Sequence, residues 1–159
     1  HAALDQHARR RRRAADTFSV LMIAVDHFKA VNDRHGHEAG DQALTHISRL
    51  MAQALRTQDR LGRFGGEEFV ALLPASNLAR ALAEAESLRL QVRSQPLQLG
   101  ELSVPLSVSI GVAEWAGTSE DLSRLLARAD DALYRAKRLG RDRVEAATQG
   151  GAEPRVQPG

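Results

Sequence analysis

The chain of 159 residues contains no cysteine, and this absence excludes several kinds of site. Without thiols it can form no disulfide and no thiolate metal centre, so any metal must be held by oxygen or histidine ligands. Long apolar runs are also missing: none approaches the roughly 20 residues of a membrane span, and we find no signal peptide. We therefore expect a cytoplasmic domain that does not insert directly into a membrane.

Neither sign of charge is in large excess, because the formal net charge is only +2. The basic character is local, with five consecutive arginines at positions 9–13. Such a run can touch nucleic acid or anionic lipid. No aromatic side chains are interleaved with it, which favours the solvated face of an N-terminal helix or linker. We therefore expect no nucleic-acid partner.

What is present is the composition of one globular domain, with 43% hydrophobic and 26% charged residues. A chain of this length can bury the hydrophobic core of one domain, but it is too short for two domains of ordinary size. The pattern predicts a linker or partial helix over 1–16 and the domain over 17–147. A tail rich in glycine and proline, over 148–159, is expected to be disordered.

The apolar periodicity predicts the elements of the domain. A continuous apolar run at 18–25 is typical of a strand buried on both faces, and Asp26 then takes the N-cap of a short helix. The later elements are a loop at 35–41, a long helix from Asp41 to 55, a hairpin closed by Pro74, a helix over 78–92, a strand over 106–112 and a helix over 122–136 ended by Gly140. This order predicts an α+β, ferredoxin-like fold with a mostly antiparallel central sheet flanked by helices.

The most informative stretch is the sequence RFGGEEFV at 63–70. Paired glycines between apolar runs predict a hairpin turn, because glycine reaches positive φ without steric cost. Glu67 and Glu68 follow at once. The tip therefore offers a backbone that a large anion can approach, together with carboxylates that can hold a divalent cation. From these residues alone, an ordinary acidic hairpin is the alternative.

Further segments accompany the hairpin: DHFKAVND and GHEAGD within 26–41, and ADDALYRAKRLGR at 129–141. With GGEEF, they resemble the signature motifs of the diguanylate cyclase (GGDEF) family of bacterial signalling domains, over roughly residues 17–146. The resemblance implies the palm-like fold of nucleotidyl cyclases and a magnesium or manganese cofactor. It implies condensation of two GTP molecules into cyclic di-GMP and two pyrophosphates. It also implies a homodimer and an upstream sensory or dimerising domain in the full-length protein.

The resemblance assigns Asn32 and Asp41 to the guanine base, with His37 close to the nucleotide. The chemistry agrees, because a carboxylate accepts both the ring and the exocyclic N–H of guanine, a pattern that adenine cannot offer. The alternative is that Asp41 merely caps the long helix.

Lys29 lies just inside a helix start, where backbone N–H groups and the helix dipole favour phosphate. The resemblance adds Lys137 and Arg141 as the clamp on the triphosphate. These two are four apart, so they share a helix face or its immediate extension. The resemblance also makes Glu67 the metal-binding and catalytic glutamate, with Glu68 beside it.

The chain departs from the family pattern at one position. The family's first strand normally ends in Asp-x-Asp-x-Phe-Lys, and its first Asp is a principal metal ligand, whereas this chain has Ala24 there. Asp26 lies two residues on, on the same face if the strand persists. The expected metal ligands are then Asp26, the Val25 carbonyl and Glu67. Losing a carboxylate should weaken metal binding and slow the chemistry, while guanine and phosphate recognition survive.

Arg56 and Asp59 end five residues before the double glycine and match the family's Arg-x-x-Asp product-inhibition motif. The resemblance implies that the arginine pairs with phosphate or stacks on guanine while the aspartate reads the base edge. An ordinary ion pair at the end of a helix is the alternative.

Three functions follow from these motifs. The first is a diguanylate cyclase domain that is active as a dimer and restrained by its product. The second is a catalytically weakened domain, marked by Ala24, that binds GTP or cyclic di-GMP and signals through a partner domain. The third is a dimerisation scaffold that binds no nucleotide, which has little support because the guanine and phosphate residues are retained.

Overall fold

The computed structural model describes residues 17–148, so the expected linker and nearly all of the expected tail lie outside the described residues. Within this range a five-stranded sheet has the strand order β2–β3–β1–β6–β7, and a separate two-stranded sheet pairs β4 with β5. The elements are β1 (Phe18–Val25), α2 (Phe28–His35), α3 (His37–Ala54), β2 (Arg60–Arg63), β3 (Glu68–Pro74), α4 (Leu78–Arg93), β4 (Leu97–Leu99), β5 (Leu102–Val104), β6 (Val108–Glu114), α5 (Leu122–Arg138) and β7 (Val144–Ala146).

Strand β1 forms the centre of the sheet because its apolar run is buried on both faces. It pairs antiparallel with β3 on one side and with β6 on the other, while β7 adds to β6 in parallel. Val20, Met22 and Ala24 pack into the cluster that contains the apolar face of α5. The alternate residues Leu21 and Ile23 pack into the larger cluster formed with α3 and α4.

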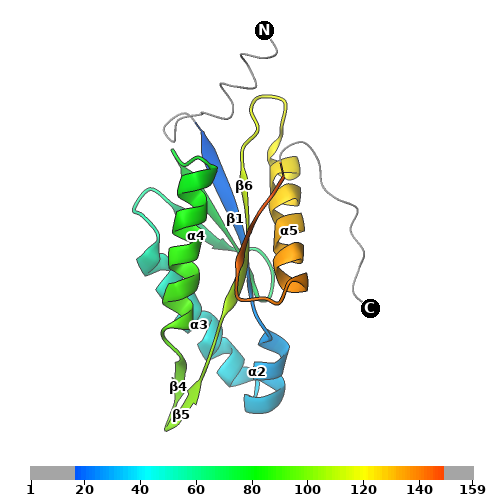
Figure 1. Ribbon diagram of the computed structural model, residues 1–159. Coiled ribbons are helices and arrows are strands. Elements are labelled where there is room, and N and C mark those ends of the chain that lie inside the picture. The colour runs from blue at the N-terminus through cyan, green and yellow to red at the C-terminus, as the bar shows by residue number, and fades with distance from the viewer. Residues whose placement is uncertain (1–16, 149–159) are drawn as a thin grey trace.

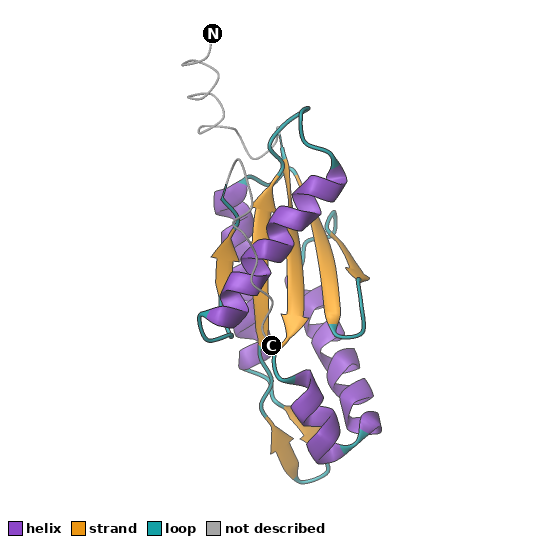
Figure 2. Cartoon of the chain, turned by 90° about the vertical axis from the view of Figure 1, so that its right-hand side faces the viewer, coloured by secondary structure: helices purple, strands orange, loops and turns teal. Residues whose placement is uncertain are grey.

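The helices therefore form two layers around the sheet. Figure 1 shows α5 on one side of the strands and α3 and α4 on the other, and Figure 2 shows α5 crossing in front of the sheet. The short helix α2 and the β4–β5 hairpin extend together from one end of the molecule. The predicted α+β, palm-like architecture, with a mostly antiparallel sheet flanked by helices, is confirmed.

Gly111 permits the close packing of α5 on the sheet. A Cβ at this position in β6 would lie 2.1 Å from the carbonyl oxygen of Ala129 and 2.3 Å from the backbone nitrogen of Leu133. Contacts that short do not occur, so any side chain here would push the helix away from the strand. The packing of α5 against β6 therefore requires glycine at position 111.

Two predicted helix starts were wrong. The N-cap of α2 is His27, with φ 54° and no side-chain cap bond, because the Asp26 carboxylate is directed to β6 instead. Helix α3 begins at His37 rather than Asp41. Gly36, with φ 91°, donates its N–H to the Asn32 carbonyl at 2.8 Å and turns the chain directly into the next helix, so no loop separates the two.

The three shortest strands were not predicted from the sequence. Strands β4, β5 and β7 each contain three residues, too few for an alternating pattern to be recognised. Strand β6 begins at Val108 rather than at 106 and continues to Glu114. In the part of the chain that the structure describes, no helix is long and apolar enough to cross a membrane.

Candidate functional site

The glycine-rich hairpin joins β2 to β3 and reaches the carboxyl end of β1. Phe64 and Gly65 both donate their N–H groups to the Glu68 carbonyl, at 2.8 and 3.2 Å, and Arg63 donates to the Gly66 carbonyl at 2.6 Å. The predicted reason for the glycines was wrong, because neither Gly65 nor Gly66 adopts a positive φ. A Cβ on Gly66 would meet nothing within 4 Å, so the glycines leave the tip open rather than forcing its turn.

The two glutamates of the hairpin lie beside the last residues of β1. Val25 donates its N–H to the Glu67 carbonyl at 3.1 Å, and Glu68 stands directly opposite Ala24 in the strand register. Both glutamates are half-buried, whereas Ala24 is only 1% exposed. The methyl group of Ala24 therefore occupies the place from which an aspartate would face Glu68.

Asp26 joins three segments at this end of the sheet. Its carboxylate accepts hydrogen bonds from the Ser107 hydroxyl at 2.7 Å, from the Ser109 hydroxyl at 2.6 Å and from the backbone N–H of Asp142 at 3.0 Å. The residue is 6% exposed. Asp26 thus ties the end of β1 to β6 and to the turn after α5, and protein donors already occupy both of its oxygens.

These residues supply oxygen donors of the type that a hard divalent cation prefers. The donors nearest the end of β1 are Glu67, Glu68, the Val25 carbonyl and the hydrogen-bonded Asp26. Across residues 17–148, no group of three acidic or histidine side chains converges where it could hold a metal ion. The donor set therefore fits magnesium or manganese in kind but is one carboxylate short.

The expected guanine-binding residues are brought together by the packing of α2 on α3. Gly40 makes this possible, because a Cβ there would lie 1.8 Å from the Asn32 side-chain oxygen and 3.2 Å from the Phe28 ring. Asp41 follows Gly40 inside α3 and is exposed. Because α3 begins at His37, Asp41 is the fifth residue of the helix, and the alternative in which it caps that helix is wrong.

The residues expected to lie near the phosphates and the nucleotide are found at the starts of α2 and α3 and at the end of α5. Lys29 is in the first turn of α2, with its side chain 91% exposed and its amine 3.8 Å from Asp33. His37 is the exposed first residue of α3. Lys137 lies in the last turn of α5, which ends at Arg138, and Arg141 follows in the left-handed region with φ 64°.

The turn after α5 is fixed from two sides. Arg141 donates its N–H to the Ala136 carbonyl at 2.9 Å, which closes the helix end. The next residue, Asp142, binds Asp26 through its backbone and Arg89 of α4 through its carboxylate at 2.8 Å, and it also contacts Arg93. The turn that carries Arg141 is therefore held next to the carboxyl end of β1.

Arg56 and Asp59 form a compact cluster between α3 and β2. Asp59 accepts hydrogen bonds from the Arg56 backbone N–H at 2.8 Å and from its guanidinium at 3.3 Å. The guanidinium also donates to the Ser76 hydroxyl at 2.5 Å and lies 3.3 Å from the Glu84 carboxylate of α4. The Arg56–Asp59 ion pair that we gave as the alternative is present, within a larger network.

Sequence reasoning missed the partners of the motif residues. Ser107, just before β6, and Ser109, within it, hold Asp26 and alternate with apolar residues. Two polar residues on one side of an apolar run are a signal that was available. Asp142, Ser76 and Glu84 gave no such signal, because each meets its partner only through the fold.

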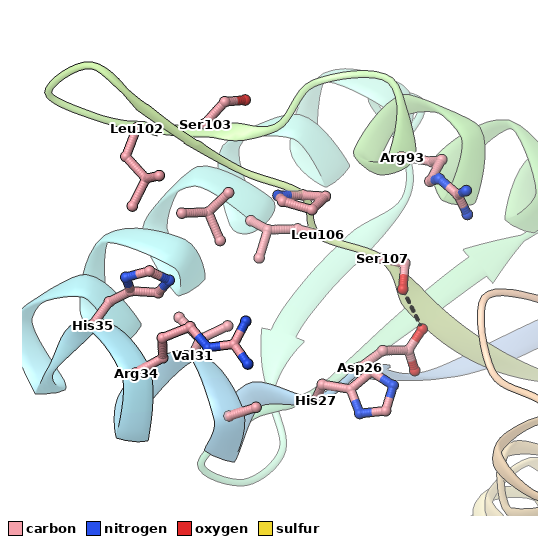
Figure 3. Close-up of a pocket in the computed structure, with 13 residues that line it drawn as sticks. Asp26, His27, Val31, Arg34, His35, Arg93, Leu102, Ser103, Leu106 and Ser107 are labelled. Carbon is pink, nitrogen blue, oxygen red and sulfur yellow. Dashed lines mark hydrogen bonds between the residues drawn. The ribbon is translucent and has the colours of Figure 1, made fainter.

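A cavity of about 580 Å³ lies on the other side of α2, against the segment 102–107 (Figure 3). Val31 and Leu106 supply apolar lining, while Arg34 and His35 line it with basic groups. Neither Asn32 nor the residues expected to bind phosphate line this cavity. Helix α2 therefore separates the cavity from the expected guanine site.

Comparison with known proteins places the chain in a family. The family model described as "Diguanylate cyclase, GGDEF domain" matches residues 1–143. Diguanylate cyclase DgcM of Escherichia coli is 44% identical over 134 residues, which is 84% of this chain and 32% of that protein. The chain spans 21–35% of the length of the first curated relatives it matches.

Solved structures agree with the sequence relatives. The active GGEEF domain of a diguanylate cyclase from Vibrio cholerae has a TM-score of 0.79 at 31% identity, covering 93% of this chain and 92% of that one. The GGDEF domain of DgcB from Caulobacter crescentus, in complex with c-di-GMP, has a TM-score of 0.77 at 30% identity, covering 91% and 84%. The chain therefore belongs to the GGDEF domain family of diguanylate cyclases, whose general activity is the condensation of GTP to cyclic di-GMP.

Proposed function

We propose that this chain is a diguanylate cyclase domain that binds GTP with complete guanine and phosphate sites and turns it over slowly because its metal site lacks one carboxylate. One observation carries the proposal. The glutamate hairpin, the start of α2 and the turn after α5 all meet at the carboxyl end of β1, joined by the Val25–Glu67 and Asp26–Asp142 hydrogen bonds.

The chain's own residues account for nucleotide binding. Asp41 accepts the ring and exocyclic N–H groups of guanine, and Asn32, positioned against Gly40, hydrogen-bonds the base edge. Lys29, Lys137 and Arg141 carry positive charge toward the triphosphate, with His37 close to the nucleotide. Backbone N–H groups at the start of α2 add to the field that favours phosphate.

Glu67 and Glu68 would hold magnesium or manganese, with the Val25 carbonyl and Asp26 as the remaining oxygen donors. When bound, such an ion neutralises charge that develops on the α-phosphate and promotes ionisation of a ribose 3′-hydroxyl. Ala24 removes a carboxylate from this set, and Asp26 replaces it poorly because three protein donors already bind it. Weak metal binding, rather than weak nucleotide binding, then limits turnover.

Two copies of the chain complete the active site. Each copy presents one bound GTP to the other across a two-fold axis, so that each 3′-hydroxyl attacks the α-phosphate of the opposite nucleotide and expels pyrophosphate. An upstream sensory or dimerising domain in the full-length protein would control this encounter. Cyclic di-GMP bound at Arg56 and Asp59 would restrain it.

A second candidate is a receptor module that binds GTP or cyclic di-GMP and signals without turnover. It is favoured by the buried Ala24 opposite Glu68, together with the three hydrogen bonds that occupy Asp26. Measurement of product formation separates the two candidates, because both predict nucleotide binding.

Calorimetric titration with GTP and ATP tests the nucleotide site directly. We expect GTP to bind in preference to ATP, and Asp41→Asn to weaken GTP binding at least about tenfold while ATP binding changes little. Glu101→Gln, which removes an exposed carboxylate at the tip of the β4–β5 hairpin, serves as the control. Equal binding of GTP by the Asp41→Asn variant and the unaltered chain would contradict the assignment.

A further inference from the structure

The Arg56 guanidinium is already held on several sides by the chain itself. Its Nη2 donates to Asp59 at 3.3 Å, to the Ser76 hydroxyl at 2.5 Å and to the Pro74 carbonyl at 3.2 Å. From α4, Glu84 Oε1 lies 3.3 Å from Arg56 Nε. Only 23% of the Arg56 side chain is exposed. Any phosphate that binds Arg56 must therefore compete with these partners.

Glu84 is the unusual member of this cluster. Its second oxygen, Oε2, is buried and has no hydrogen-bond partner, and no other buried side-chain nitrogen or oxygen within residues 17–148 shares that condition. The Glu84 side chain is 11% exposed and that of Asp59 is fully buried. Two carboxylates thus share one guanidinium where little water reaches them, which is unfavourable when both are ionised.

The surroundings favour a proton on Glu84. Burial raises the pKa of Glu84 most, and two further causes add to it: the hydrogen bond that a protonated Glu84 donates to Asp59, and charge repulsion from Asp59. Together they raise this pKa to about 7, against the opposing attraction of Arg56 and Arg80. A protonated Glu84 can donate to Asp59, which satisfies the unpartnered oxygen and removes the negative charge by which Glu84 attracts Arg56. When the proton leaves, the ion pair with Arg56 is restored.

We propose that Glu84 is a further residue of the product site formed by Arg56 and Asp59, and that its carboxylate competes with the phosphate of a cyclic dinucleotide for the Arg56 guanidinium. The inference rests on the proposed product site. A phosphodiester is anionic throughout the neutral range, so an ionised Glu84 opposes it by repulsion and by holding Arg56. A neutral Glu84 does neither, so the phosphate then competes with one charged partner fewer for Arg56.

The charged groups that face Glu84 come from each element packed around it. Arg56 and Asp59 approach from the segment between α3 and β2, and Arg80 lies one turn earlier in α4. Ser76, just before α4, adds a neutral hydroxyl to the same guanidinium. Because the pKa of Glu84 is raised to about 7, cyclic di-GMP is expected to bind more tightly below pH 7 than above it.

Calorimetric titration of the full chain with cyclic di-GMP at about pH 6 and about pH 8 tests the proposal. If the protonated form binds, the population of that form falls about tenfold between these values, and affinity falls with it. Glu84→Gln should bind at both values as tightly as the unaltered chain does at about pH 6. Glu101→Gln should keep the pH dependence of the unaltered chain, and Arg56→Ala should lose binding.

The outcomes separate the two proposals. Binding that requires Arg56 but shows the same affinity at both pH values, or a Glu84→Gln variant that keeps the pH dependence, would overturn the role of Glu84 and leave the product site intact. Binding that survives Arg56→Ala unchanged, or no binding by any variant, would overturn the product site and the role of Glu84 with it. Far-ultraviolet circular dichroism of each variant shows that the fold is retained.

Discussion

Position 24 lies at the end of the central strand, directly opposite Glu68 of the hairpin. Its methyl group is almost fully buried and packs with Val20 and Met22 against α5. An aspartate there would stand near the hairpin glutamates and Asp26, and such a group of carboxylates is stable only with a cation among them. We therefore expect the side chain at this position to control metal affinity.

Gly40→Ala tests how α2 and α3 position the base-binding residues. The added Cβ would lie 1.8 Å from the Asn32 side-chain oxygen, so the Asn32 side chain must move from its position against α3. We expect GTP affinity to fall by about tenfold, because a hydrogen bond to the base is lost. Helix stability should gain from the alanine, which partly offsets the steric cost.

The matched control is Gly62→Ala, where a Cβ meets nothing within 4 Å and no positive φ is required. Both variants are compared by GTP titration and by thermal unfolding. Unchanged GTP affinity in Gly40→Ala would show that the contact between Asn32 and Gly40 does not position the base.

Glu120 gives the protein a predictable sensitivity to acid. Although burial opposes its ionisation, hydrogen bonds from Arg128 at 2.6 Å and from the Ala116 N–H at 2.9 Å lower its pKa. A carboxyl group whose pKa is lower in the folded state stabilises the fold above its unfolded pKa of about 4.5, and this contribution is lost as pH falls through the folded pKa.

Glu120→Gln should therefore lower the free energy of unfolding by about 3 kcal/mol at neutral pH, because it leaves Arg128 buried without its counter-charge. The difference from the unaltered chain should shrink on acidification. Urea unfolding at about pH 7 and about pH 3 measures both values. A deficit of equal size at both pH values would contradict the assignment.

At this scale the sequence contained the motif residues but gave no information about their partners. The motif residues could be recognised because each motif is contiguous in the chain. Glu84 lies 28 residues from Arg56, and Asp142 lies 116 residues from Asp26, so only folding brings these pairs together. Local spacing carries no information about such contacts.

At the scale of elements, the Asp26 hydrogen bonds hold β1, β6 and the turn after α5 in one arrangement. Ser109→Ala removes the 2.6 Å bond to this buried carboxylate, and we expect the free energy of unfolding to fall by about 2 kcal/mol, the usual value for a hydrogen bond to a charged group. Ser103→Ala, on the exposed β4–β5 hairpin, should change stability little. Equal stability of both variants in urea would show that the Asp26 network contributes nothing to the fold.

The long elements followed from the sequence, since β1, α4 and α5 have the periodicity and length that burial imposes. The starts of α2 and α3 did not follow. Asp26 and Asp41 are both good capping residues. The Asp26 carboxylate, however, accepts a hydrogen bond from Ser109 of the neighbouring strand, and Asp41 lies inside α3, whose N-cap is Gly36. Tertiary contacts decided these boundaries.

At the scale of the whole molecule, the proposed reaction needs two copies of the chain. If each copy holds one nucleotide, as proposed, the rate per copy should rise with protein concentration until dimers predominate. Fusion to a dimerising coiled coil should remove this dependence, because it fixes the local concentration of the partner domain. A rate per copy that is independent of concentration in the unfused chain would contradict the requirement for two copies.

The most direct test of the central claim is GTP turnover to cyclic di-GMP by the coiled-coil fusion of this chain, beside the same fusion carrying Ala24→Asp. Manganese binding and GTP binding are measured on both proteins. We expect equal GTP affinity of the two proteins and slow turnover by the present chain. We expect at least about tenfold faster turnover and tighter manganese binding by Ala24→Asp. Product from Ala24→Asp alone would favour the receptor module, and equal rates, or no GTP binding by either protein, would contradict the claim that a missing carboxylate limits this domain.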